Sequence, residues 1–264
     1  MNKSSVVISA LVLLAGGFGG YYYWQANQAT PDDTITEEVV PEEVTPEVQL
    51  IVDDSPDKTP LPLLEESDSF LMESMATVLG NESLMKIFIN KNIIQRMVVT
   101  IDNLPSMTAP SKMMPIEMAA GTFMTSGSEN NLVISPDNAE RYSPYMKVVD
   151  AIDAKTLVQL YARVYPLFQQ SYEELGYPNK YFNDRLLFVI NDLLAAPDIE
   201  EPVKLVQPLV VYKFADPDLE ASNIGQRIMM RIGSKNEEIL KSKLRDIKME
   251  LLNHMDKKKV KSAV

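Results

Sequence analysis

The hydrophobic and polar positions of this 264-residue chain follow three successive patterns. Residues 6–24 are uncharged and mostly apolar, residues 31–66 are dominated by acids and prolines, and from residue 67 onward apolar residues recur at mainly helical spacing. At ~1.5 Å per residue, a helix over the first stretch would be roughly 28 Å long, about the thickness of the hydrocarbon core of a bilayer. The pattern predicts a transmembrane helix, a linker and a helical domain.

Residues 1–28 are expected to form an uncleaved signal anchor in the inner (cytoplasmic) membrane. Lys3 precedes the apolar stretch, and a positive flank favours a cytoplasmic N-terminus. Tyr21–Trp24 end the stretch with aromatic rings, which prefer the headgroup level. A cleaved signal peptide is the alternative, but Ala26 and Ala29 lack the spacing of a typical cleavage site. A single-pass anchor in this orientation would leave the domain in the periplasm.

Residues 29–60 are predicted to be a disordered, acidic, proline-rich linker. From Pro31 to Glu66 the chain has twelve acidic residues and a single base, Lys58. It has six prolines there and no Phe, Trp or Tyr. Such a composition buries too little apolar surface to offset the conformational entropy lost on folding, and its charges repel one another. The linker would therefore act as a spacer between the membrane and the domain.

Residues 61–255 are predicted to form one helix-rich globular domain, followed by a basic tail at 256–264. Helical spacing of apolar residues predicts helices at 67–79, 83–89, 92–101, 145–152, 154–175, from 179 or 183 to 194, 219–232 and 235–255. Pro166 lies inside the longest of the central patterns, so that helix should be kinked or split.

Two regions of the domain are predicted to be extended. Residues 122–125 and 132–135 flank a turn-rich segment and are expected to form a short hairpin. Residues 203–214 are the best single strand, although Pro208 confines such a strand to an edge or a strand start. The expected fold class is therefore α+β and predominantly helical, with a hairpin and one further strand.

Composition excludes several function classes. Residues 31–66 carry almost all of the net charge of −12, so the chain from residue 67 onward is nearly neutral and lacks the basic footprint of a nucleic-acid-binding protein. The chain has no cysteine, which excludes thiol catalysis and cysteine-ligated zinc. His254 is the only histidine, which argues against a Ser-His-Asp triad and a multi-histidine metal site. No cofactor or metal is expected.

The densest group of polar and aromatic residues lies between two predicted central helices. Together with one arginine further along the chain, it supplies the candidate binding surface: Tyr172, Glu174, Tyr177, Tyr181, Asn183, Asp184, Arg185 and Arg227. The tyrosines could stack on a sugar or a peptide. Glu174 and Asp184 could instead act as general acid and base on a glycan. A third interpretation is structural, with the same residues capping helices and pairing with one another.

Five segments of the domain resemble the bacterial family known as domain of unknown function 3014. The segments are LPLLEESD (61–68), YSPY (142–145), YPLFQQSYEELGYPNKYFNDRLLFVINDLLAAP (165–197), LVQPLVVYKFADPDLE (205–220) and GQRIMMRIG (225–233). The resemblance runs from residue 61 to about residue 252. It implies one N-terminal membrane span, a variable linker and then the domain, and it implies no activity, cofactor or catalytic residue.

The sequence as a whole favours a membrane-anchored, extracytoplasmic binding protein of the bacterial cell envelope. Its partner would be an envelope protein or the cell-wall polymer, besides the membrane that holds its N-terminal helix. The alternative is a carboxylate-dependent hydrolase or lyase that acts on cell-wall glycan. Catalysis would need two carboxylates in one open cleft, whereas binding needs only an exposed apolar or aromatic patch.

Overall fold

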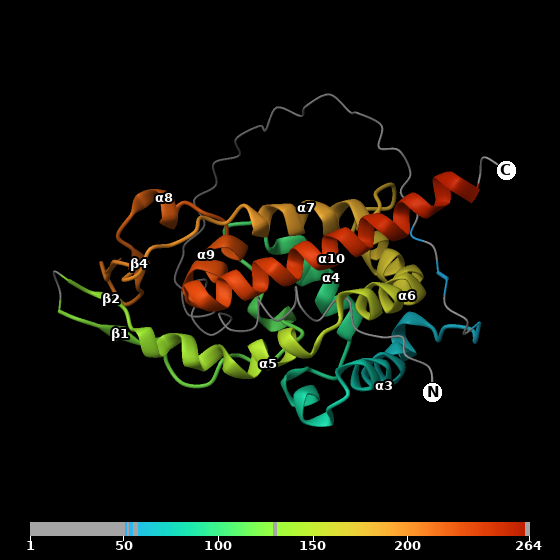
Figure 1. Cartoon of the computed structure of the whole chain (residues 1–264), viewed down its shortest axis with the longest axis horizontal. Helices are drawn as coiled ribbons and strands as arrows, with labels where there is room; N and C mark the ends of the chain where they lie inside the picture. Colours follow the sequence, from blue (N-terminus) through green and yellow to red (C-terminus); the bar gives the residue numbers. More distant parts are fainter. Residues whose placement is uncertain (1–50, 52, 55–57, 129–130, 262–264) are drawn as a thin grey trace.

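The computed structural model describes residues 51, 53–54, 58–128 and 131–261 (Figure 1). This part of the chain is mostly helical, as the sequence predicts, and it contains two small antiparallel sheets. The predicted anchor, residues 1–28, and most of the predicted linker lie outside it. Among the helices that are described, none is both long enough and apolar enough to cross a bilayer.

The main core is built around α6 (Ala154–Glu174). Helices α4 (Ile93–Asn103) and α10 (Ser234–Lys261) pack against α6, and α7 (Phe182–Leu194) contacts all three of these helices. The predicted apolar positions of α6 are buried. They include Leu157, Leu160, Tyr161, Val164, Leu167 and Phe168. The helical spacing seen in the sequence therefore marks the side of each helix that meets its neighbours.

The N-terminal part of the domain consists of η1 (Leu64–Glu66), α3 (Ser67–Leu79) and η2 (Glu82–Ile87). The predicted bounds of α3 are confirmed. Asp68, in its first turn, accepts hydrogen bonds from the backbone N–H groups of Asn92 (2.7 Å) and Ile93 (2.9 Å). These donors lie at the start of α4, so a side chain from one helix satisfies the N-terminus of the next.

The first predicted hairpin is confirmed in a shorter form. Strands β1 (Thr125–Ser126) and β2 (Val133–Ile134) are antiparallel, with Thr125 opposite Ile134. The chain continues through η4 (Pro136–Tyr142) and α5 (Ser143–Ala151), and another short 3-10 turn, η3 (Ser111–Met113), lies before the hairpin. The opposite side of β2 reaches the second sheet, because Ile134 donates its backbone N–H to the carbonyl oxygen of Val203 at 3.0 Å.

The prediction of one strand over residues 203–214 is wrong. The structure has two strands there, β3 (Leu205–Val206) and β4 (Lys213–Phe214), which pair antiparallel across the loop of residues 207–212. Pro208 lacks the backbone N–H that a continuous strand would need, and it lies in this loop. Both Leu205 and Phe214 are buried, in a second small core with Val203 and Met230.

The helix predicted over residues 219–232 is two helices, α8 (Pro217–Glu220) and α9 (Ile224–Arg231). The break falls at residues 221–223 because Asn223 caps α9: its side chain accepts a hydrogen bond from the backbone N–H of Gln226 at 2.9 Å. The last helix, α10, is longer than predicted and ends at Lys261, so residues 256–261 of the expected basic tail are helical.

Pro166 does not split α6, which is one helix of 21 residues. The proline lies on the exposed side of the helix, where its ring displaces no core side chain. Tyr165 and Leu167 on either side of it are buried. Packing of the buried stripe therefore outweighs the loss of one helical hydrogen bond.

Part of the predicted linker packs on the domain. Ile51 is only 9% exposed and belongs to the main core. The Asp53 carboxylate lies 3.8 Å from the guanidinium of Arg163 on α6, and the same guanidinium donates to the carbonyl oxygen of Thr59. The folded unit therefore includes residues that the sequence assigned to the linker.

The two ends of the domain are formed by different elements. Figure 1 shows both hairpins and α8 at one end of the long axis, while the segment that enters from Ile51 lies toward the other end, near α3 and the last turns of α10. The helical core fills the space between them.

Candidate functional site

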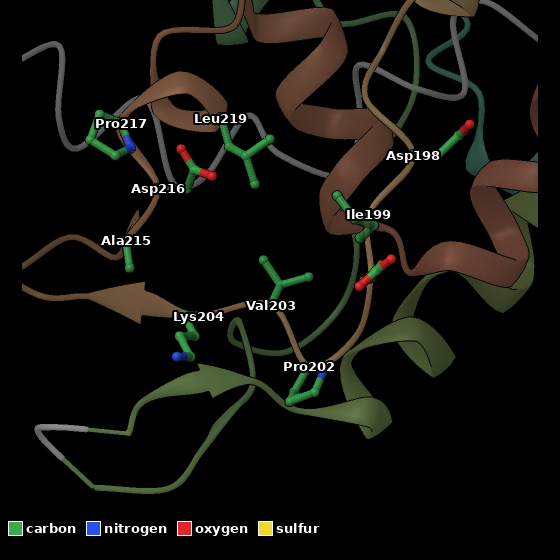
Figure 2. Close-up of a pocket in the computed structure, with 10 residues that line it drawn as sticks. Asp198, Ile199, Pro202, Val203, Lys204, Ala215, Asp216, Pro217 and Leu219 are labelled. Atoms are coloured by element: carbon green, nitrogen blue, oxygen red, sulfur yellow. The ribbon is translucent and has the colours of Figure 1, made fainter.

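A cavity of about 700 Å³ lies at the hairpin end of the domain (Figure 2). One wall is the segment that follows α7, and the other is the segment that leaves β4 and begins α8. The lining residues are Asp198, Ile199, Glu200, Pro202, Val203, Lys204, Ala215, Asp216, Pro217 and Leu219. Six of these ten residues are apolar, so the cavity has an apolar interior with charged groups around it.

Local sequence explains how the second wall is formed. Asp216 accepts a hydrogen bond from the backbone N–H of Asp218 at 2.9 Å, and Pro217 occupies the first turn of α8. An acidic cap followed by proline is a favourable start for a helix. The short helix then directs Leu219 toward the cavity, as Figure 2 shows.

A second cavity of about 360 Å³ shares Asp198 and Ile199 with the first. Its other lining residues come from the first turns of α10. They are Ser234, Glu237, Glu238, Lys241 and Arg245. The 198–199 segment therefore separates two adjoining cavities, and α10 holds it from one side.

Lys241 ties this segment to α10. Its ammonium group is within 2.7 Å of the carbonyl oxygen of Ala196, 2.6 Å of Asp198 and 2.8 Å of Glu237. The ammonium group thus makes two hydrogen bonds and a close ion pair with Glu237, although Lys241 and Glu237 are almost fully buried. An ammonium group with all three acceptors in place can remain charged in a buried position.

The pKa values at this cluster follow from burial and pairing. Burial raises the pKa of the Glu237 carboxyl, and the nearby ammonium of Lys241 offsets only part of that effect. Burial alone would lower the pKa of Lys241, but the hydrogen bonds and charges of Asp198 and Glu237 raise it above its ordinary value. The hydrogen bond from Lys241 lowers the pKa of Asp198, whose side chain is otherwise exposed.

The predicted surface between α6 and α7 contains a structural network centred on Asp102 of α4. The Arg185 guanidinium lies 2.8 Å from one Asp102 oxygen, and the Tyr177 hydroxyl donates to the other at 3.2 Å. The Tyr177 ring stacks on that of Tyr172, with centroids 4.6 Å apart. The network therefore links the α6–α7 connection to α4, and the predicted pairing of Arg185 with Asp184 is replaced by pairing with Asp102.

Within the cluster between α6 and α7, two of the predicted surface residues are buried. Asn183 is fully buried, and its side-chain oxygen accepts a hydrogen bond from the Tyr161 hydroxyl at 2.6 Å. Tyr172 is 3% exposed, and burial raises its pKa to about 12. Asn183 therefore lies within α7 and links it to α6. The expectation that Asn183 caps α7 is wrong.

The remaining candidates of this cluster lie nearer the surface. Glu174 is exposed and accepts a hydrogen bond from Gln170, one turn earlier on α6, at 2.9 Å. Tyr181 is half-buried at the N-terminal boundary of α7. Asp184 is also half-buried, and burial raises its pKa. Neither Glu174 nor Asp184 lines either of the two cavities.

Arg227 is distant in sequence from that cluster and has a different role. It is 5% exposed, and its guanidinium lies 3.5 Å from the Glu220 carboxylate. It also donates to the carbonyl oxygen of Met107. Pairing with Glu220 was one of the arrangements that the sequence left open, and the contacts join α9 to α8 and to the loop after α4.

The most exposed apolar group was not among the sequence candidates. Leu209 is 85% exposed and Val210 61%, in the loop between β3 and β4, and Val206 beside them is 45% exposed. The sequence predicted these residues as part of a strand, which implied partial burial. A signal was present in Pro208, because a proline between two short apolar runs is typical of a loop.

The described residues include no candidate metal site. In those parts of the chain, no three or more His, Asp or Glu side chains are grouped so that they could hold an ion. The arrangement near the hairpins instead offers an apolar loop beside a cavity with charged edges, which is suited to binding.

We expect Asn183→Ala to lower the free energy of unfolding by about 2 kcal/mol, because the Tyr161 hydroxyl would lose its acceptor in a buried position. Urea denaturation would measure this. Adding Tyr161→Phe should cost less in the Asn183→Ala background than in the wild type, since the pair is already broken. The control is Asn191→Ala, an exposed position on the same helix. Strict additivity of the two substitutions would show that the bond contributes nothing.

We expect Lys241→Met to destabilise the protein by roughly 3 kcal/mol near neutral pH, because the buried Glu237 carboxylate would lose its partner. The Glu237 pKa is already raised in the folded state, so this carboxyl favours folding more as pH falls through the window between its unfolded and folded pKa values. Without Lys241 that pKa would rise further. The deficit should therefore shrink between pH 7 and pH 5.

Thermal unfolding of the wild type and the variant across this pH range would test the expectation. Lys235→Met, an exposed lysine in the first turn of α10, is the matched control and should change stability little at any pH. A deficit that stayed constant from pH 7 to pH 5 would contradict the assigned role of Glu237.

Comparison with known proteins gives one match. Residues 93–248 fit the model of a family described as "Protein of unknown function (DUF3014)". No curated protein and no solved structure matches the chain. The matched region covers more than half of the chain and contains α4, α6, α7, the first part of α10, both hairpins and the first cavity. The chain therefore belongs to the DUF3014 family.

Proposed function

We propose that this protein is a single-pass, membrane-anchored binding protein of the bacterial cell envelope, with its N-terminus in the cytoplasm and its domain in the periplasm. The observation that carries the binding role is the exposure of Leu209 (85%) and Val210 (61%) in one loop. Apolar side chains so exposed and adjacent are typical of a surface that another molecule covers. The partner is a protein of the envelope, which this loop contacts.

The position of the loop supports this assignment. The β3–β4 loop lies at the hairpin end of the domain, away from the segment through which the chain arrives at Ile51 (Figure 1). A domain held from one end would present the other end to its surroundings. The membrane that holds the anchor is therefore a less suitable occupant for the loop than a second protein.

The arrangement of carboxylates gives less support to hydrolysis of cell-wall glycan. That function would place a general acid and a second carboxylate in one cleft. Glu174 is exposed on α6 and bonded to Gln170, while Asp184 lies on α7, and neither faces one of the two cavities. Near the larger cavity, Asp198 is bonded to Lys241 and Asp216 caps α8.

The membrane topology rests on the uncharged stretch of residues 6–24. We expect alkaline phosphatase fused after residue 264 to be active, because this enzyme folds only where its disulfides form. The same fusion lacking residues 6–24 should be inactive. Cell fractionation would accompany the assay, with the intact fusion in the membrane fraction. Activity without residues 6–24, or recovery of the intact fusion as a soluble protein, would contradict the anchor.

The binding role is tested by photo-crosslinking in intact cells. A photoreactive residue in place of Leu209 in the full-length protein should give one discrete adduct, identified by mass spectrometry as an envelope protein. The control replaces Leu63, which is 67% exposed and directly precedes η1. Val210→Ser should reduce the Leu209 adduct because it removes the adjacent exposed apolar side chain. Equal labelling from both positions, or none from Leu209, would contradict the proposal.

A further inference from the structure

We infer that the cavity in Figure 2 is a subsite for a lysine or arginine side chain, supplied by an extended segment of the protein that covers the β3–β4 loop. This inference rests on the proposed function, because it names the chemistry of the partner at the same end of the domain. It also assigns a separate role to residues outside the loop, which can be tested independently.

The interior of the cavity is suited to an aliphatic chain. Ile199, Val203 and Leu219 approach one another from the two walls in Figure 2, and Ala215 and Pro202 extend the apolar lining. Its volume of about 700 Å³ lies within the range of small-ligand pockets, roughly 300–1,000 Å³. Lysine and arginine side chains bury an apolar stem while their charged ends remain near polar groups.

The charges around the cavity favour a cation at the end of that chain. Asp198, Glu200 and Asp216 line it, against the single base Lys204. Asp198 is already paired with Lys241. Within the described part of the chain, however, no ion pair involves Glu200 or Asp216, and both are exposed. A guanidinium or ammonium group entering here would therefore meet a carboxylate without an ion pair on either wall of the cavity.

The cavity and the apolar loop lie close enough for one segment to contact both. Lys204 at the cavity edge and Val206 of β3 are two residues apart, and both are exposed, whereas Leu205 between them is buried in the small core. At ~3.3 Å per residue this separation is roughly 7 Å, the distance between alternate side chains of an extended chain. A matching partner segment would carry a basic residue two positions from an apolar one.

The chain's own lysines at 257–261 do not reach this cavity within one molecule. Lys257 lies 23 residues along α10 from Ser234, which lines the adjoining cavity. At ~1.5 Å per residue the two ends of that stretch are about 35 Å apart. A second copy of the chain could supply those lysines, and crosslinking from Leu209 would reveal this as an adduct between two copies.

The test uses the full-length protein in lipid nanodiscs, with isotope-labelled isoleucine, leucine and valine methyl groups observed by NMR. The probe is the peptide acetyl-Leu-Ser-Lys-Ser-Leu-amide, compared with peptides carrying norleucine or glutamate in place of lysine. We expect the lysine peptide to shift the methyl signals of Ile199, Val203 and Leu219 saturably. Its dissociation constant should be at least tenfold lower than those of the other two peptides.

Two substitutions remove the negative charges of Glu200 and Asp216 with little effect on structure. Glu200→Gln and Asp216→Asn together should weaken binding of the lysine peptide at least tenfold, and asparagine keeps the oxygen that caps α8. Asp218→Asn is the matched control, since Asp218 belongs to the same short helix but does not line the cavity. The control should bind within twofold of the wild type.

Three results would overturn the inference: equal binding of the norleucine peptide, unchanged binding by the double variant, or no saturable shift at these methyl groups. A different result would contradict the proposed function. If the Leu209 adduct with an envelope protein forms equally well in the double variant, the binding surface stands and the basic subsite fails. If no adduct forms in the wild type, the proposed function itself fails.

Discussion

The packing of three helices around α6 is the constraint on which the rest of the structure depends. Helix α6 buries eleven of its 21 residues, and these cover more than one side of the helix because α4, α7 and α10 all contact it. A helix surrounded in this way leaves little room for polar groups without partners. The Tyr161 hydroxyl, at the centre, is therefore matched by the Asn183 side chain on α7. Apolar packing and this hydrogen bond together fix how α7 lies against α6.

The hairpin end is joined to this core by polar contacts between neighbouring elements. Lys241 on α10 holds the segment after α7, and Asp192 on α7 accepts hydrogen bonds from Asn223 and Gln226 of α9. Gly225 of α9 packs so closely on α7 that a Cβ there would lie 2.7 Å from a methyl carbon of Leu193. These contacts place the cavity walls and the β3–β4 loop relative to the helices, so the exposed surface rests on rigid elements.

The helices could be predicted from sequence because their apolar residues recur with the period of the helix. The bounds of α3, α6 and α7 depend on local signals of this kind, including Gly80 after α3 and Asp153 as the cap of α6. The strands were harder to predict. Residues 203–214 are rich in apolar residues, but the paired segments are only two residues long and the rest form an exposed loop.

The site could be predicted only in part, because its contacts join residues far apart in the chain. Asp102 lies 75 residues before Tyr177 and was not a sequence candidate, yet it determines where Tyr177 and Arg185 lie. Periodicity indicates which side of a helix is buried but not which helix covers it. The structural interpretation of the polar cluster between α6 and α7 therefore agrees with these contacts. The sequence did not indicate the cavity, because its walls come from irregular segments.

The main role of the Lys241 cluster is to fix the position of the segment after α7, rather than to add to the free energy of unfolding. Replacing a buried ion pair with apolar residues of similar size is often neutral or stabilising, since desolvation of the charges offsets their attraction. Apolar residues at both 237 and 241 would avoid that desolvation, but they would not select one position for the residues after α7. The ammonium group does select one, because its three acceptors are Ala196, Asp198 and Glu237. Two of them, Ala196 and Asp198, belong to the segment that follows α7, so the lysine fixes the cavity wall that contains Ile199.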